Sequence, residues 1–127
     1  MRDLASNLKF ITALSPAVQA ATVNGVAVDT KGFGSAAFVL NTGAIAGAGD
    51  FGAKLQESDV SGSGYTDVAP GDLTGSFEAT AVADATDKVS YIGHKRYVRL
   101  VLTKAGGTSI AAGAVAILGH AAERPIS

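Results

Sequence analysis

The feature that most constrains the fold is a run of aromatic, β-branched and aliphatic residues from Tyr97 to Leu102, at the end of the segment YIGHKRYVRLVL. Side chains of these types favour a strand that is buried on at least one face. A regular strand would place its residues on two sides, with Arg96, Val98, Leu100 and Leu102 on one and Tyr97, Arg99 and Val101 on the other. We expect this strand to lie in the centre of a sheet, paired in a hairpin with the charge-free segment 110–120.

Short segments with strand patterns recur along the rest of the chain, at roughly the spacing of about 8–12 residues that β-sandwiches and barrels show. Pro16 is expected to end the first strand, because proline has no amide hydrogen to give to a ladder. Asn24-Gly25 predicts a type I′ hairpin turn, and the glycine-rich segment 43–50 predicts a loop. The other expected strands are residues 8–14, 17–23, 26–30, 35–41, 51–59, 65–68, 75–82 and 88–94.

The whole pattern predicts an all-β fold, because no stretch has the sustained periodicity of an amphipathic helix. We expect an antiparallel β-sandwich of jelly-roll type, formed as a single domain by residues 1–127, since a chain of 127 residues matches one domain. Residues 1–7 and 121–127 are candidate extended arms. There is no signal-peptide pattern and no apolar run of about 18 residues, so we expect a soluble protein without a membrane partner.

Residue types used in catalysis and metal binding are present, but without the spacing that such sites need. The chain has no cysteine, which removes disulfides and thiolate metal sites. His94 and His120 are far apart, and no G-x-S-x-G elbow marks a nucleophile. We therefore expect no enzyme activity, catalytic residue, metal, cofactor or small-molecule substrate. Two acid pairs lack the ligand density of a calcium loop and are expected to be solvated: Glu57 with Asp59, and Asp84 with Asp87.

The densest cluster of charge in the chain consists of Lys95, Arg96 and Arg99. One interpretation is a contact patch for an acidic partner surface. The other, which we favour, is that Arg96 and Arg99 pair inside the protein with carboxylates such as Glu57 or Asp67. Ten Lys and Arg residues against eleven Asp and Glu residues give a net charge of -1. The chain therefore has no general attraction to nucleic acid or to an anionic membrane.

Three segments together resemble a group of small tailed-phage virion proteins that are usually encoded near the major capsid protein. The most telling phrases are AKLQESD followed by YTDV, and YIGHKRYVRLVLT followed by a glycine-rich turn and GAVAILGH. The three segments are MRDLASNLKF, FVLNTGAIAGAGDFGAKLQESDVSGSGYTDV and YIGHKRYVRLVLTKAGGTSIAAGAVAILGHAAERP. The likeness covers nearly the whole chain, and its motifs are structural phrases rather than catalytic signatures.

What the resemblance implies is a capsid decoration (cement) protein, which forms homotrimers on the outside of the phage head and binds the major capsid protein. Such a protein would be made in the host bacterial cytoplasm and carried on the virion. The candidate contact residues are Arg2, Leu4, Leu8, Ile45, Lys95, Arg96, Arg99, Arg124 and Ile126. Two alternatives stay open: a head-tail joining or tail-associated structural protein, and a carbohydrate-binding β-sandwich module that uses Tyr65, Tyr91 and Tyr97.

Overall fold

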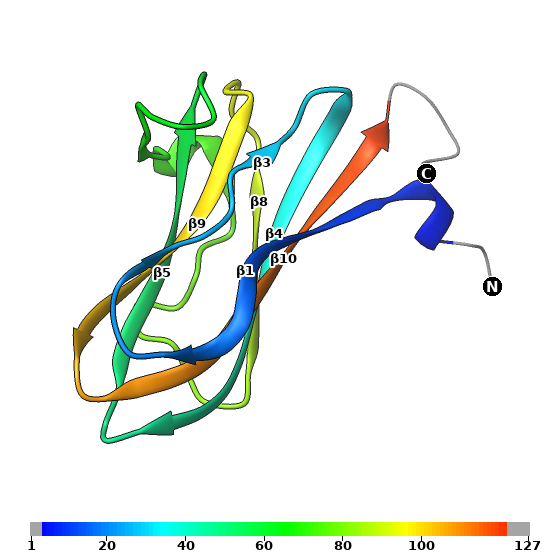
Figure 1. Cartoon of the computed structure of the whole chain (residues 1–127). Coiled ribbons are helices and arrows are strands. Elements are labelled where there is room, and N and C mark those ends of the chain that lie inside the picture. The colour runs from blue at the N-terminus through cyan, green and yellow to red at the C-terminus, as the bar shows by residue number, and fades with distance from the viewer. Residues whose placement is uncertain (1–3, 122–127) are drawn as a thin grey trace.

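The computed structural model describes residues 4–121 and consists of two antiparallel sheets packed face to face (Figure 1). Sheet A has the strand order β1 (Lys9–Gln19), β10 (Ser109–Ala121), β4 (Phe33–Ala46), β8 (Thr86–Tyr91) and β7 (Leu73–Thr74). Sheet B has the order β2 (Val23–Asn24), β9 (Tyr97–Gly106), β5 (Asp50–Ser58) and β6 (Thr66–Asp67), and β3 (Val28–Asp29) also pairs with β9. The short 3-10 helices are η1 (Ala5–Asn7) and η2 (Pro70–Asp72).

The path of the chain is that of a jelly roll. Successive strands pass from sheet A to sheet B and back, and each sheet has first and last strands of the chain beside each other, as in the pairs β1 with β10 and β2 with β9. Every pairing between strands is antiparallel. The prediction of an all-β antiparallel sandwich of jelly-roll type is confirmed.

The core lies between the two sheets and is made of their inward-facing side chains. The largest of the completely buried side chains are Phe38, Phe51, Leu100, Leu102, Ile110 and Leu118. In β9 the predicted alternation holds, because Val98, Leu100 and Leu102 all point into this core. β9 has β5 on one side and β2 with β3 on the other, so the prediction of a central strand is also confirmed.

The predicted hairpin between the Tyr97–Leu102 strand and residues 110–120 is wrong. β9 lies in sheet B, whereas β10 lies in sheet A between β1 and β4. The connection passes through Gly107, which has a φ of 73° and lies so close to Ala48 that a Cβ would come 2.1 Å from its carbonyl oxygen. Strands that face each other across a core are as apolar as strands that pair, so apolar composition alone does not predict the pairing.

The predicted Asn24-Gly25 hairpin is wrong as well. β2 and β3 both pair with β9 along the same edge, and the Gly25 amide between them donates to the Leu100 carbonyl at 2.7 Å. A Cβ on Gly25 would come 2.3 Å from the Ala13 oxygen and 2.6 Å from the Leu100 oxygen. Glycine is therefore needed here for the close approach of two backbones rather than for a turn.

Pro16 does not end the first strand, which continues from Lys9 to Gln19. The register between β1 and β10 shifts from Leu14 to Ala17, so the proline lies at an irregular position of the ladder. β1 is an edge strand of sheet A. Both circumstances let a strand contain a proline, because fewer of its amide groups must donate to a neighbour.

Two predicted boundaries differ from the structure. The expected loop 43–50 is mostly strand, since β4 ends at Ala46 and β5 begins at Asp50. The expected strand at 75–82 is an irregular segment instead. It is held by the Ala81 amide, which donates to the Phe51 carbonyl at 2.7 Å, and by Phe77, which packs against the core. The alternation of apolar and polar residues in 75–82 therefore comes from a loop that packs against the sandwich, not from a strand.

Candidate interaction surfaces

Two members of the basic cluster, Lys95 and Arg96, lie just before β9 and are both ion-paired. The Lys95 ammonium donates to the Asp59 carboxylate at 2.8 Å. Arg96 donates through Nε and Nη2 to the two oxygens of Asp29, at 2.9 and 2.8 Å. This two-point contact with Arg96 lowers the pKa of Asp29 from 3.8 to about 2, against a smaller opposing effect of burial.

Arg99 is held differently, without a carboxylate. Its Nε and Nη2 both donate to Oε1 of Gln56, the residue opposite it on β5, at 3.0 and 2.7 Å. The guanidinium carbon lies 4.0 Å from the centre of the Tyr65 ring, within cation–π distance. Within the described residues, the three ion pairs are formed by Lys54, Lys95 and Arg96, and Arg99 takes part in none of them.

The interpretation that these arginines pair inside the protein is right for Arg96 and wrong in its proposed partners. Asp67 pairs instead with Lys54 at 3.0 Å, and its pKa is lowered chiefly by the Gln56 amide and then by Lys54. Glu57 turns toward the other sheet. The sequence did not indicate which carboxylate would pair with Arg96. Asp29 is distant from Arg96 in the chain, and it comes close because β3 pairs with β9.

Glu57 forms a link between the sheets with Tyr91, the last residue of β8. The Tyr91 hydroxyl donates to Oε1 of Glu57 at 2.7 Å and accepts from the Lys95 amide at 2.9 Å. Burial, followed by the hydrogen bond to Glu57, raises the pKa of Tyr91. Gly93 lies directly over this ring, where a Cβ would come 2.5 Å from the hydroxyl oxygen. Of the predicted acid pairs, Glu57 is thus a structural partner rather than a solvated charge.

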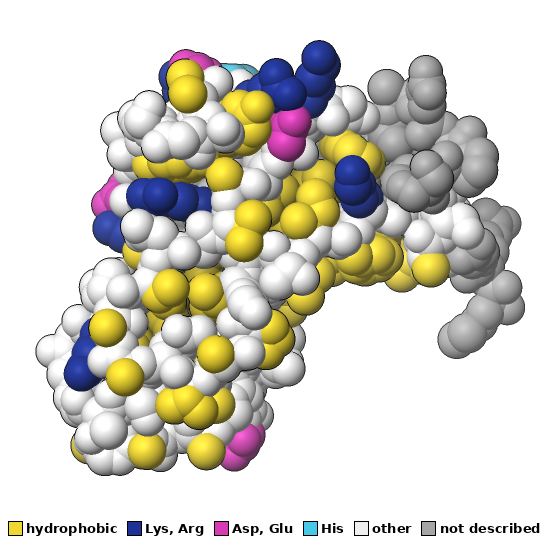
Figure 2. Space-filling model, viewed as in Figure 1, with side chains coloured by type: hydrophobic (Ala, Val, Ile, Leu, Met, Phe, Trp, Pro, Cys, Tyr) yellow, Lys and Arg dark blue, Asp and Glu magenta, His cyan; other side chains and the backbone are white. Residues whose placement is uncertain are grey.

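The five residues Lys54, Gln56, Tyr65, Asp67 and Arg99 lie on the outer side of sheet B and are called the charged face below. Their side chains form a continuous set of contacts in which Gln56 accepts from Arg99 and donates to Asp67 at 3.0 Å. Most of the Lys and Arg side chains visible in Figure 2 lie in the upper half of that view.

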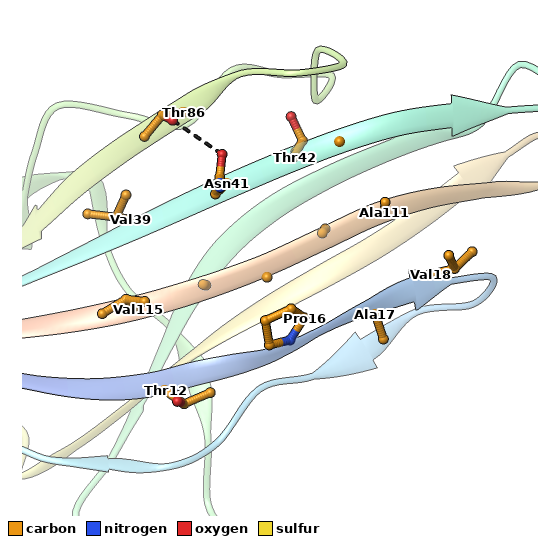
Figure 3. A pocket seen from close by; sticks show the side chains of 14 residues that line it. Thr12, Pro16, Ala17, Val18, Val39, Asn41, Thr42, Thr86, Ala111 and Val115 are labelled. Carbon is orange, nitrogen blue, oxygen red and sulfur yellow. Dashed lines mark hydrogen bonds between the residues drawn. The ribbon is translucent and has the colours of Figure 1, made fainter.

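The outer side of sheet A is of the opposite kind. Along β1, β4 and β10 the only ionisable side chains are Lys9 and His120, both near strand ends. At the side of this region β8 adds Lys88, which is exposed and opposite Val39. The outward residues of β1, β4 and β10 are mostly small or apolar and surround an open hollow of about 710 Å³ (Figure 3). We call this the uncharged face, and it comprises Phe10, Thr12, Pro16, Val18, Val39, Asn41, Ala111, Gly113 and Val115.

Val115 lies at the middle of the uncharged face. It is opposite Thr12 of β1 on one side and Val39 of β4 on the other. Its side chain is 41% exposed, and those of Phe10 and Val18 are 52% and 70% exposed. A patch of exposed apolar side chains on the outer side of a sheet is a common mark of a protein-binding surface.

The uncharged face was not predicted from the sequence, because the charge-free segment 110–120 was expected only to pair in a hairpin at the centre of a sheet. Only the inward positions of β10 are buried in the core, among them Ala112, Ala114 and Ala116. The signal was present in the alternation: Val115 and Ile117 alternate with small residues that must fit between two sheets. A strand without charged residues therefore predicts that both of its faces are suited to being covered. The cover on one of these faces can come from another molecule.

The other candidate contact residues are placed as follows. Leu4 is exposed, at 66%, and Leu8 is half-buried over Gly119. Ile45 lies in β4, not in a loop, and packs partly against the core. Their role as contacts stays a prediction. Arg2, Arg124 and Ile126 lie outside the described residues.

Within the described residues there is no group of three or more His, Asp and Glu side chains that could hold a metal ion. His94 is exposed, and Nδ1 of His120 is hydrogen-bonded to the Ser35 hydroxyl. The tyrosines considered for a carbohydrate platform are not a free row, because Arg99 lies over Tyr65, Arg96 lies over the Tyr97 ring at 5.0 Å, and Tyr91 is buried. Over residues 4–121, no helix is long and apolar enough to cross a membrane.

Similar chains are found among solved structures. No family model and no curated protein matches this chain. One of these structures is described as that of infectious bursal disease virus Gx strain, and it is 16% identical with a TM-score of 0.46. The match covers 93% of this chain and 34% of that one, so this chain spans about a third of the length of the protein it resembles. At this identity the likeness concerns the fold alone.

Proposed function

We propose that this chain is a capsid decoration protein of a tailed phage, which binds the outside of the assembled shell and stabilises it. The observation that carries the proposal is the uncharged face, a rigid outer sheet surface that exposes Phe10, Val18 and Val115. It is supported by the resemblance of the sequence to small tailed-phage virion proteins. The structure presents a surface suited to docking, which fits a structural role.

In the proposed mechanism the uncharged face lies against the surface of the major capsid protein. The nine residues of this face carry no charge, so covering them removes no ion from water, and burying their apolar side chains stabilises the contact at about 25 cal/mol per Å². Three copies joined as a homotrimer engage together, so that individually weak contacts add up to firm attachment. The shell then resists expansion by the pressure of the DNA inside it.

The test is to mix the purified protein with expanded capsids that lack it, and to count bound copies as the protein concentration rises. Saturable binding of hundreds of copies, together with a higher temperature of capsid disruption, is expected. Binding of about six or twelve copies at one vertex would instead indicate the head-tail joining or tail-associated alternative. Absence of saturable binding would end the proposal.

A further inference from the structure

Arg99 differs from the other paired cations of the protein in what surrounds its charge. Arginine has five N–H groups in a planar fork. Two of these groups, on Nε and Nη2, donate to the same oxygen of Gln56. Within the described residues, Nη1 of Arg99 donates to no side chain or carbonyl with hydrogen-bond geometry, so one edge of the fork stays open.

The position of the fork is nevertheless fixed. Gln56 holds one edge, and the Tyr65 ring covers one side of the guanidinium plane at 4.0 Å. The hydroxyl of Tyr65 donates to the Ser61 carbonyl at 2.8 Å, which fixes the ring in turn. A side chain held in this way has already lost most of its rotamer freedom, so a ligand on the open edge binds with little further ordering of the arginine.

Gln56 also explains why the charge of Arg99 remains available. Its amide oxygen accepts from Arg99, and its amide nitrogen donates to Asp67. Asp67 is ion-paired with Lys54 at 3.0 Å. Two cations and one carboxylate leave the charged face with a net charge of +1. A neutral side chain thus separates Arg99 from the nearest carboxylate, where a glutamate would have neutralised it.

We propose that the open edge of Arg99 binds a carboxylate side chain on a neighbouring capsid subunit, other than the one that the uncharged face contacts, because the outer sides of the two sheets point in opposite directions. The inference rests on the proposed function for the identity of that partner. A carboxylate is favoured because its two oxygens match two parallel N–H groups of the fork. One unpaired positive charge suits a single carboxylate and does not provide the extended array that a nucleic-acid backbone needs.

The first experiment uses acetate as the probe and needs no capsid. The side-chain Nε–H signals of arginine are followed by NMR during titration with sodium acetate, against sodium chloride at equal ionic strength. A saturable shift at Arg99 with acetate alone is expected, and none at Arg96, whose fork is occupied by Asp29. Equal shifts at both arginines, or no shift at Arg99, would overturn the site.

The second experiment compares Arg99→Gln with the matched variant Arg96→Gln in binding to undecorated capsids. Loss of a charge-assisted pair is expected to weaken binding about tenfold or more for Arg99→Gln, with Arg96→Gln close to the unmodified protein. Arg99→Lys keeps the charge but not the fork, and is expected to lose nearly as much as Arg99→Gln. Circular dichroism and thermal unfolding of each variant confirm that it is folded.

The two experiments separate failure of this inference from failure of the proposed function. If the unmodified protein binds no capsids, the proposed function is wrong, and the acetate titration still decides whether Arg99 is a carboxylate site. If the unmodified protein binds and folded Arg99→Gln binds equally well, the inference is wrong and the proposed function stands.

Discussion

The two outer faces of this sandwich belong to the same fold but carry opposite kinds of side chains. On the charged face of sheet B, polar side chains contact one another, and the Tyr65 ring lies beneath the Arg99 guanidinium. On the uncharged face of sheet A, a sheet of comparable regularity exposes Phe10, Val18 and Val115 with no polar network over them. Only the second face has an obvious gain in stability from being covered.

The interior of the protein differs from both faces in how its polar groups are hydrogen-bonded. Within the described residues, each buried side-chain nitrogen or oxygen has a hydrogen-bond partner. The interior therefore leaves no polar group waiting for a ligand. Of the two faces, that of sheet A leaves apolar side chains exposed to water, and that of sheet B leaves the Nη1 edge of Arg99 without a partner within the described residues. The contrast can be tested by changing one face at a time.

The largest effect is expected when the same charge is placed on the uncharged face and, separately, outside both faces. Val115→Lys puts an ammonium in the middle of the uncharged face, where docking would bury it without a partner, and should weaken capsid binding by about a hundredfold or more. Thr66→Lys makes a matched change at an exposed position of β6 that belongs to neither face and should leave binding within about threefold. Counting bound copies on expanded capsids gives both values.

Both substitutions are at exposed or half-exposed strand positions, so the free energy of unfolding should change by less than about 1 kcal/mol in each. Denaturant unfolding checks this. Equal losses of capsid binding for the two folded variants would mean that the uncharged face has no special role.

A smaller effect is expected at the link between the sheets. Tyr91→Phe removes the hydroxyl that donates to Glu57 and accepts from the Lys95 amide. Because these groups are partly buried and left unpaired, the free energy of unfolding should fall by about 2 kcal/mol. Tyr65→Phe is the matched control, since its hydroxyl bond to Ser61 is exposed and should be worth well under about 1 kcal/mol. Urea unfolding of both variants is the measurement, and similar losses would contradict the link.

The smallest effect concerns the Arg96–Asp29 pair at the end of sheet B. The pKa of Asp29 is about 2 in the folded protein against an ordinary 3.8. A carboxyl whose pKa is lowered by folding stabilises the protein above its ordinary pKa, and this contribution is lost as the pH falls from about 4 to about 2. Since the Asp29 side chain is 42% exposed, the pair should contribute less than about 1 kcal/mol.

Asp29→Asn should therefore reduce stability near pH 5 and become equal to the unmodified protein near pH 2. Thermal unfolding between these pH values gives the two curves. Curves that stay parallel throughout would show that the pair adds nothing that depends on the charge of Asp29. At 1 M salt the difference should shrink, because exposed pairs are screened.

How much of this could be predicted depends on whether the governing interaction is local. Alternation along a strand is local, so the strands at 35–41, 51–59 and 97–102, and the faces of β9, were predicted correctly. Pairing between strands is not local. Asn24-Gly25 has the composition of a turn, but Gly25 is required by the backbone of Ala13 and Leu100, which come from other parts of the chain.

The candidate site shows the same limit. That Arg96 would be paired follows from its place beside a central strand, but its partner Asp29 is set by the route of β3 along β9. Gln56, the residue that distinguishes Arg99 from its neighbours, has no signature in a sequence. The uncharged face could have been found, because it follows from the alternation of β10 and the lack of charge in β1 and β4.

Pro16 has a consequence for a protein that exposes apolar side chains on one of its sheets. Open sheet edges invite other chains to add as further strands, which leads to aggregation. Within the described residues the edge strands are β1, interrupted by Pro16 and a shift in register, and two-residue strands such as β6 and β7. None offers a long, regular ladder to an incoming strand. A contact with another chain is therefore expected to form through side chains on the faces of the sandwich rather than by addition of a strand at its edges.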